Sequence, residues 1–158
     1  DPKALIERQL VLFQERFLAE HDDFGTRSLG DVVIMASMLE REEPRPDQRK
    51  LVAGILWKRI DNDWNLGVDA TSRYTLDVWN DRRAFLGKLR DPDDPYNSRL
   101  RPGLPPTPIG NPSLPSLEAA IDPEASPYWY YLHDATGTLR PAKDARGHEA
   151  NRARYNVY

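Results

Sequence analysis

The 158-residue sequence contains no cysteine, which excludes disulfide bonds and zinc sites with cysteine ligands. Its three histidines, His21, His133 and His148, do not have the spacing of metal ligands. No apolar run is long enough to cross a bilayer, and no signal peptide is apparent. The net charge is −3 and there is no cluster of lysine and arginine, which argues against a nucleic-acid partner. We therefore expect a protein that works without a metal ion, a cofactor or a nucleic acid.

What the sequence does contain is typical of one globular domain, residues 1–158. Hydrophobic residues make up 39% and charged residues 30%, and the length is sufficient for a core. The order of periodic segments predicts an α+β fold, mainly helical with a small antiparallel sheet. The expected helices are 1–21, 28–43, about 47–60, a short one within 77–95, 116–121 and a last one from about 145; the expected strands are 128–133 and 138–142, joined by a turn at 134–137. Residues 62–74 are rich in turn formers and hydroxyl groups, and they predict a loop or a short extended segment.

The first helix is expected to pack against the rest of the domain. Ile6, Leu10, Phe13 and Phe17 recur at helical spacing and form one apolar stripe. A turn that contains Gly25 follows, so residues 1–27 form a leading helix and turn. Because the chain opens directly in this helix, we expect it to be a piece of a longer protein.

Residues 28–43 predict the central helix of the fold. Ser28 and Asp31 have the spacing of a capping box, in which each side chain bonds an amide at the helix start. No charged residue occurs between Val32 and Leu39, and a helix that is apolar on all sides is normally buried. Pro44 disfavours helical geometry at the preceding residue, so the helix is expected to end there.

Glu40 follows the apolar part of this helix and is the candidate catalytic residue. Helical spacing places it above Ser37 and Val33, on a face that has just carried apolar side chains. Partial desolvation and the negative end of the helix dipole both predict a raised pKa. A carboxylic acid that stays protonated near neutral pH can act as a general acid. The alternative is a solvated helix end in which Glu40 pairs with a cation and has only a structural role.

A proline-rich loop is the most distinctive stretch of the sequence. Five prolines and two glycines occur between positions 102 and 112. Such a loop has little conformational entropy left to lose, so it can hold a binding surface in place at low cost. We expect residues 104–112 to lie against the cleft that contains Glu40. The alternatives are a linker or a polyproline segment that binds a partner.

Four blocks, taken in order, resemble the YceG-like (MltG) family of endolytic murein transglycosylases. Residues 36–42 resemble the family's A-S-I-V-E-K-E helix motif, and 52–60 its V-A-G-V-F-Y-N-R-L helix. Residues 66–74 resemble its L-x-S-D-P-T-V-x-Y segment, and 96–113 its Y-N-T-Y…G-L-P-P-G-P-I-x-N-P-G loop. The tail is similar too, and the resemblance extends from about residue 28 to the end. The departures include Ala70 where the family has proline, a different stretch at 140–144, and Glu149 where the family has asparagine.

The resemblance implies a lytic transglycosylase that cuts bonds between N-acetylmuramic acid and N-acetylglucosamine in nascent peptidoglycan and leaves 1,6-anhydro ends. The family's catalytic glutamate, the first acid of its helix motif, falls on Glu40, which would serve as both acid and base. Asp69 and Glu42 are candidates for electrostatic assistance. The expected substrate-binding residues are Ser37, Asp69, Thr71, Tyr74, Tyr96, Asn97, Pro106, Ile109, Asn111, His148 and Asn151. Buried polar side chains mostly bond to backbone, so bracing of loops is the alternative role for the polar residues of this set.

The resemblance also implies a setting for the protein. Its partners would be peptidoglycan glycan strands, with peptidoglycan synthases as further candidates. The expected location is the extracytoplasmic face of the bacterial membrane, reached through an N-terminal anchor that family members carry and this sequence lacks. Two other functions stay open from sequence: a non-catalytic module that binds peptidoglycan or scaffolds the division machinery, and a hydrolytic muramidase.

Overall fold

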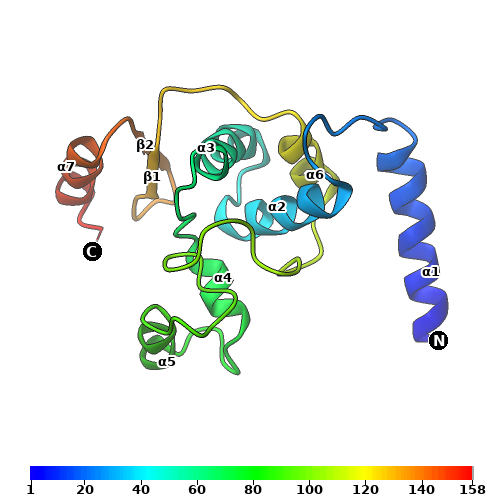
Figure 1. Ribbon diagram of the computed structural model, residues 1–158, viewed down its shortest axis with the longest axis horizontal. Helices are drawn as coiled ribbons and strands as arrows, with labels where there is room; N and C mark the ends of the chain where they lie inside the picture. Colours follow the sequence, from blue (N-terminus) through cyan, green and yellow to red (C-terminus); the bar gives the residue numbers. More distant parts are fainter. Residues whose placement is uncertain (158) are drawn as a thin grey trace.

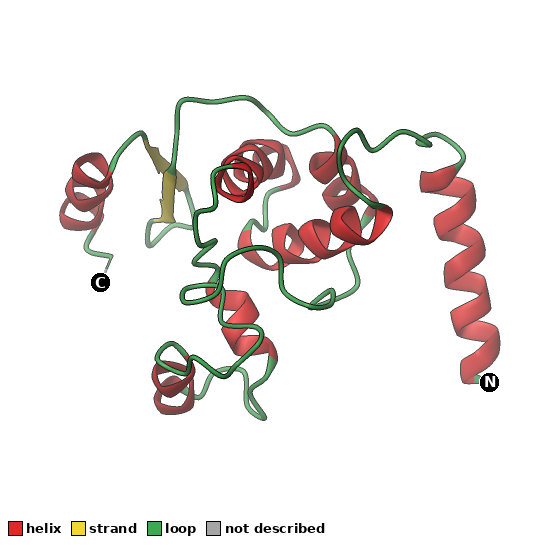
Figure 2. Cartoon of the chain, in the orientation of Figure 1, coloured by secondary structure: helices red, strands yellow, loops and turns green. Residues whose placement is uncertain are grey.

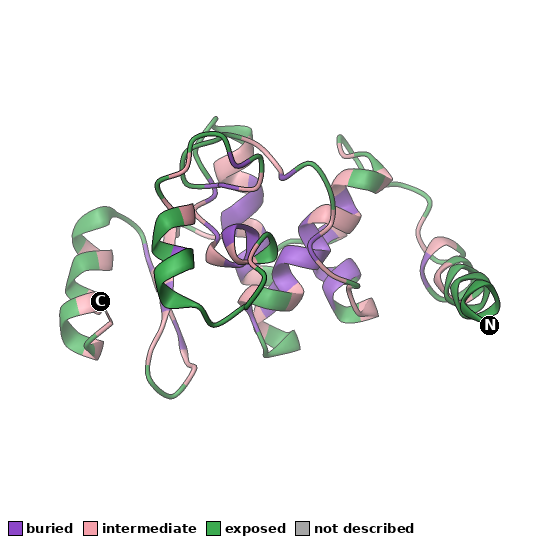
Figure 3. Ribbon diagram, turned by 90° about the horizontal axis from the view of Figure 1, so that it is seen from below, coloured by how far each residue is buried: buried purple, intermediate pink, exposed green. Residues whose placement is uncertain are grey.

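Three helices meet in the centre of the protein: α2 (Leu29–Glu42), α3 (Arg49–Asp61) and α6 (Leu114–Ile121) (Figure 1). The computed structural model describes residues 1–157. The facing sides of these helices form the core, and Figure 3 shows the buried residues gathered there. The indole nitrogen of Trp57 donates a hydrogen bond to the Ala120 carbonyl oxygen at 2.9 Å and so ties α3 to α6.

Helix α2 begins and ends where the sequence predicts. The Ser28 hydroxyl accepts a hydrogen bond from the Asp31 amide at 3.0 Å, and the Asp31 carboxylate accepts one from the Ser28 amide at 2.9 Å. Most side chains from Val32 to Leu39 are buried. Glu43 has extended backbone angles and caps the C-terminus, as expected before Pro44.

Helix α3 follows a 3₁₀ turn (Pro46–Gln48) and contains a glycine that has a packing role. A Cβ atom at Gly54 would overlap the carbonyl oxygen of Glu124. The Glu124 amide also donates to the Lys50 carbonyl oxygen at 2.9 Å, so the segment after α6 lies directly on this helix. Glycine is required at position 54 because backbone, rather than a side chain, occupies the neighbouring space.

The sheet is an antiparallel pair, β1 (Tyr130–His133) and β2 (Leu139–Ala142), drawn in yellow in Figure 2. In the register Tyr131 lies opposite Pro141. The expected turn is present, and Gly137 has a positive φ of 74° there. Helix α7 (Ala145–Tyr155) packs against both strands. The α+β fold, mainly helical with a small antiparallel sheet, is therefore confirmed.

The segment after α3 differs from the prediction of a loop or an extended stretch. It contains a short helix, α4 (Asp69–Tyr74). Thr71 and Ser72 are buried, and the Thr71 hydroxyl donates to the Val68 carbonyl oxygen at 2.7 Å. Tertiary burial of these side chains overrides the turn-forming composition, and an acid in the first turn suits the helix dipole. The next helix, α5 (Arg82–Lys88), lies within the range predicted for a short helix.

Helix α1 (Pro2–Phe13) forms as predicted but does not pack as predicted. It projects from the body of the molecule (Figures 1 and 3) and continues into a π-helical turn, Gln14–Leu18. Ile6 and Leu10 are 56% and 62% exposed, whereas Phe17 is buried and stacks on Phe24. The apolar stripe therefore packs only at its C-terminal end. None of the described helices has the length and apolar character needed to cross a membrane.

Candidate active site

Three glutamates at the C-terminal end of α2 have three different environments. Successive residues of a helix are turned by about 100°, so Glu40 and Glu42 point in widely different directions. Glu40 faces α6, and Glu42 faces the β-hairpin. Glu43 is fully buried, and its carboxylate lies 2.8 Å from the Nε2 atom of His133.

The Glu40 carboxylate is bound by the start of α6. Its Oε2 atom accepts hydrogen bonds from the Ser113 amide at 2.9 Å, the Ser113 hydroxyl at 2.6 Å and the Ser116 hydroxyl at 2.7 Å. The Arg49 guanidinium, whose side chain is only 6% exposed, lies 3.3 Å from the same oxygen. Negative charge at a helix N-terminus is also favoured by the helix dipole. Glu40 therefore joins α2, α3 and α6 through one carboxylate.

These partners reverse the pKa shift that the sequence predicts for Glu40. Burial raises the pKa of this carboxyl, but the hydrogen bonds from Ser113 and Ser116 and the charge of Arg49 outweigh burial, and the net shift is downward. The prediction of a raised pKa at Glu40 is wrong. Its apolar helix face indicated desolvation correctly, but it did not reveal the donors that other elements bring. The environment instead matches the alternative of a structural ion pair.

Glu42 lies in a cleft of about 640 Å³ between α2, α3, α4, strand β1 and α7. The Tyr131 hydroxyl donates a hydrogen bond to its carboxylate at 3.0 Å. Burial raises the pKa of Glu42, and the negative charge of Asp69 raises it further; the Tyr131 hydrogen bond acts in the opposite direction without cancelling the rise. Burial also holds the pKa of Tyr131 well above its usual value, so its hydroxyl keeps its proton and remains a donor. The cleft thus holds a carboxylic acid suited to proton transfer.

Charged and aromatic groups from several elements form the wall of this cleft. Asp69, at the start of α4, forms an ion pair with Arg99. Arg59, at the end of α3, donates to the Trp129 carbonyl oxygen at 3.0 Å. The full lining comprises Arg41, Glu42, Arg59, Gly67, Asp69, Arg99, Tyr130, Tyr131, Leu132, His133, His148, Arg152 and Val157.

A family model and several known proteins match this chain. The model described as the YceG-like family covers residues 1–154. The chain belongs to the YceG-like family. An endolytic murein transglycosylase of Bacillus subtilis is 30% identical over 128 residues, which is 81% of this chain and 35% of the relative. An endolytic murein transglycosylase of Streptococcus pneumoniae (strain D39) is 24% identical over 159 residues, 97% of this chain and 29% of the relative.

A solved structure agrees with this family assignment. The crystal structure of a yceG-like protein from Listeria monocytogenes matches with a TM-score of 0.74 and 28% sequence identity, over 90% of this chain and 45% of that one. The predicted family is therefore confirmed. The YceG-like chain spans about a third of the length of the curated relatives that it matches.

Two of the expected substrate-binding residues of this YceG-like chain, Asp69 and His148, line the cleft beside Glu42. The His148 ring stacks on Tyr130 with centroids 5.3 Å apart, and burial lowers the pKa of His148. Asn151, one turn further along α7, instead bonds the Pro141 carbonyl oxygen at 3.3 Å and anchors α7 to β2.

Ser37 and Ile109 hold the proline-rich loop against α2. The Ser37 hydroxyl is buried; it donates to the Ile34 carbonyl oxygen at 2.7 Å and accepts from the Ile109 amide at 2.9 Å. The loop therefore lies against the helix that carries Glu40. The expectation that residues 104–112 lie against a cleft that contains Glu40 is not met, because neither Glu40 nor any residue of this loop lines the cleft beside Glu42. Ser37 and Ile109 brace the loop and do not line the cleft.

Thr71 and Asn97 are also buried and brace the backbone. The Thr71 hydroxyl is 2.9 Å from the Ser98 hydroxyl. The Asn97 amide donates to two carbonyl oxygens of the 88–91 turn, each at 2.9 Å. Both residues therefore have the alternative role, which is to brace loops.

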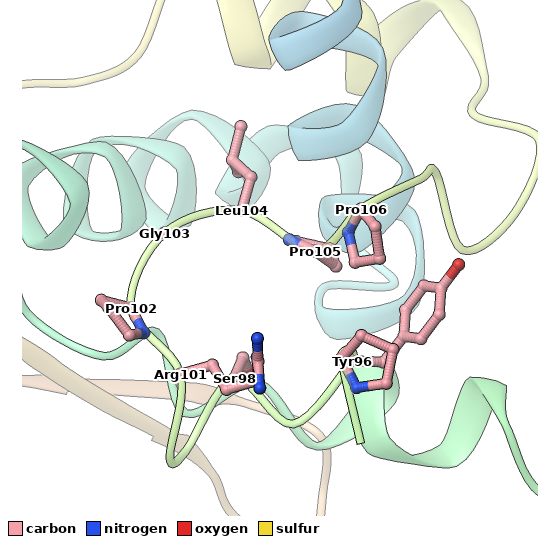
Figure 4. Close-up of a pocket in the computed structure, with 9 residues that line it drawn as sticks. Tyr96, Ser98, Arg101, Pro102, Gly103, Leu104, Pro105 and Pro106 are labelled. Carbon is pink, nitrogen blue, oxygen red and sulfur yellow. The ribbon is translucent and has the colours of Figure 1, made fainter. Parts of the chain in front are cut away.

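Tyr96 and Pro106 line a second, smaller pocket of about 230 Å³ (Figure 4). The chain curves around it from Ser98 to Pro106. Tyr74 is half-exposed beside Tyr96, with ring centroids 5.1 Å apart. Asn111 is exposed and lies outside the lining of both cavities. A substrate-binding role for Tyr74, Tyr96, Pro106 and Asn111 stays a prediction.

Tyr131, His133 and Arg59 also belong to the site, although none of them was predicted from the sequence to do so. A period-two signal was available for the first two, because alternate residues of a strand point to one face. Tyr131 and His133 share that face and both meet acids at the end of α2. Arg59 carried no comparable signal, since a cation near a helix end is usually a solvated one.

Proposed function

We propose that this YceG-like chain is the catalytic part of an endolytic lytic transglycosylase, which cleaves the bond between N-acetylmuramic acid and N-acetylglucosamine inside a peptidoglycan glycan strand. The proposal is carried by the Glu42 carboxyl, which lies in a large cleft and has a raised pKa. It is supported by the names of the relatives from B. subtilis and S. pneumoniae, both endolytic murein transglycosylases. We assign the catalytic role to Glu42 instead of Glu40, because Glu40 has a lowered pKa and is bound to Arg49 and α6.

In the first step the protonated Glu42 carboxyl donates its proton to the glycosidic oxygen. The bond between that oxygen and C1 of muramic acid breaks, and the departing N-acetylglucosamine keeps the oxygen as a hydroxyl group. Positive charge develops on the muramic acid ring, as in other glycosidic cleavages. The negative charge of Asp69 beside Glu42 favours that state.

In the second step the Glu42 carboxylate takes the proton from the C6 hydroxyl of the same muramic acid. The C6 oxygen bonds to C1, which closes the 1,6-anhydro ring and returns Glu42 to its protonated form. The hydrogen bond from Tyr131 stabilises the carboxylate between the two steps. One carboxyl group suffices for both transfers because no water molecule has to be activated.

Mass spectrometry of digested, uncrosslinked glycan strands tests this proposal. We expect internal cleavage products with 1,6-anhydro ends from the wild-type chain and none from Glu42→Gln. Products heavier by one water molecule would instead identify a hydrolytic muramidase. Strands that are bound but never cleaved would identify a non-catalytic peptidoglycan-binding module.

The substrate also implies a location and partners. Nascent glycan strands lie at the extracytoplasmic face of the bacterial membrane, and we propose that the protein acts there. Peptidoglycan synthases are candidate partners, because they produce the strands that this activity would terminate. Crosslinking of the full-length protein in cells, followed by identification of the captured synthases, tests this point.

A further inference from the structure

Two tryptophans and a tyrosine form an aromatic surface beside the cleft, and we call Trp64, Trp129 and Tyr130 the aromatic shelf. The Trp64 and Trp129 ring centroids are 4.8 Å apart, and those of Trp64 and Tyr130 are 5.9 Å apart. Tyr130 is itself part of the cleft wall. The shelf therefore continues the cleft that contains Glu42 towards the end of α3.

Trp64 is the most exposed residue of the shelf, because Trp129 and Tyr130 are both partly buried. Its side chain lies after the end of α3, and the residue is 41% exposed, although tryptophan is usually among the well-buried residues. Trp129 already contacts Trp64 on its ring, and the Lys58 ammonium lies 5.0 Å from its ring centroid. An incoming ligand would therefore meet Trp64 first.

The backbone holds the shelf in a fixed geometry around Arg59. The Arg59 carbonyl oxygen accepts a hydrogen bond from the Trp64 amide at 2.8 Å. The Arg59 guanidinium donates to the Trp129 carbonyl oxygen and also to that of Leu66. Asp63, directly before Trp64, has a positive φ of 55°, which turns the chain out of the helix. A surface that is ordered before binding loses little entropy when it binds.

We propose that the aromatic shelf is a subsite for sugar residues of the glycan strand, beyond the bond that is cut. One side of a pyranose ring presents C–H groups, and these can lie against the electron-rich face of an indole. Hydroxyl groups at the ring edge stay free to bond the polar cleft wall. This inference rests on the proposed function, because it takes the glycan strand in the cleft as the ligand.

Three variants of the chain test the subsite, each prepared with Glu42→Gln so that the ligand is not cleaved during titration. Trp64 is kept, exchanged for phenylalanine, or exchanged for leucine, which preserves apolar contact with Trp129 but removes the aromatic face. Calorimetry measures the dissociation constant for an uncrosslinked octasaccharide of the glycan strand. We expect Trp64→Leu to weaken binding about 2- to 10-fold, and Trp64→Phe to have a smaller effect.

Nuclear magnetic resonance on the parent protein supplies a test that does not depend on variant folding. We expect magnetisation transfer between indole protons of Trp64 and sugar ring C–H protons of the bound octasaccharide. Absence of that transfer, or equal dissociation constants for the leucine variant and the parent, would overturn the subsite.

Different outcomes would refute the proposed function and the subsite. Cleavage is measured in chains that retain Glu42. Anhydro-ended products together with octasaccharide binding that does not depend on Trp64 would refute the subsite alone. Octasaccharide binding that depends on Trp64, without any cleavage, would refute the proposed function and leave the subsite in place.

Discussion

Replacing Glu40 and Glu42 by glutamine, one at a time, distinguishes a structural acid from a catalytic one. At position 40 the change removes a charge that Arg49 and the serines at the start of α6 all contact. A hydrogen bond to a charged group contributes about 1.5–3 kcal/mol, and breaking a fully buried ion pair costs about 3–5 kcal/mol. Glutamine keeps one acceptor oxygen and the Glu40 side chain is 30% exposed, so we expect a loss of about 2 kcal/mol. For a chain of this length that lowers Tm by about 4–8 °C.

At position 42 we expect the reverse pattern. Glutamine cannot donate the proton, and general acid–base catalysis contributes about 100- to 10,000-fold to a rate. Because Glu42 would perform both transfers, the loss of cleavage should reach the upper end of that range or exceed it. Stability should hold or rise, since a desolvated carboxyl is replaced by a neutral amide.

The pH dependence of stability gives this comparison a second readout. The folded-state pKa of Glu42 lies above the unfolded value of about 4.3, so the folded state binds the proton more tightly. The free energy of unfolding that this contributes is complete at low pH and is lost as pH rises from the unfolded value through the folded one. The Glu42→Gln protein has no group at this position that titrates, so it does not lose this stability between pH 4 and pH 7. The difference in Tm between Glu42→Gln and the wild type should therefore be more positive at pH 7 than at pH 4.

Two assays decide the matter: thermal unfolding at both pH values, and release of anhydro-ended fragments from glycan strands. Glu40→Gln should unfold at a lower temperature and still cleave, whereas Glu42→Gln should fold and not cleave. Loss of cleavage in a Glu40→Gln protein of unchanged Tm, with an active Glu42→Gln, would refute the reasoning and return the catalytic role to Glu40.

Three further substitutions test other parts of the structure. Tyr131→Phe removes a hydrogen bond that lowers the pKa of Glu42, so the alkaline fall of the cleavage rate should move to higher pH; an unchanged pH profile would show that this contact does not tune the acid. Gly54→Ala should destabilise by about 1–3 kcal/mol, because its Cβ meets the Glu124 carbonyl group, whereas Gly87→Ala has open space and should stabilise by up to about 1 kcal/mol. Urea unfolding of both alanine variants measures the difference, and equal effects at the two sites would contradict the close approach at Gly54.

Much of the fold follows from local signals in the sequence. The capping box at Ser28, the apolar run of α2 and the aromatic strand before Gly137 each depend on a few neighbouring residues. The predictions that were wrong concern segments whose structure depends on contacts with residues far away in the sequence. Helix α4 forms because the hydroxyl group of Thr71 is buried against Ser98, which the local composition does not reveal. The exposed stripe on α1 has the same pattern that a packed helix would have, so periodicity alone cannot tell the two apart.

Local sequence signals are even less able to predict the catalytic residue, because Glu40 and Glu42 are only two positions apart on one helix. Desolvation at the end of an apolar helix could be inferred for either residue. What separates them is the chemistry of the opposing elements: hydroxyls and a guanidinium opposite Glu40, a phenol and a carboxylate opposite Glu42. Those partners lie 9 to 89 residues away along the chain, so no local pattern contains them. The direction of the pKa shift of each glutamate is therefore set by the side chains that other elements place against it. Assigning the catalytic residue of this chain requires the fold, which brings Tyr131 to α2.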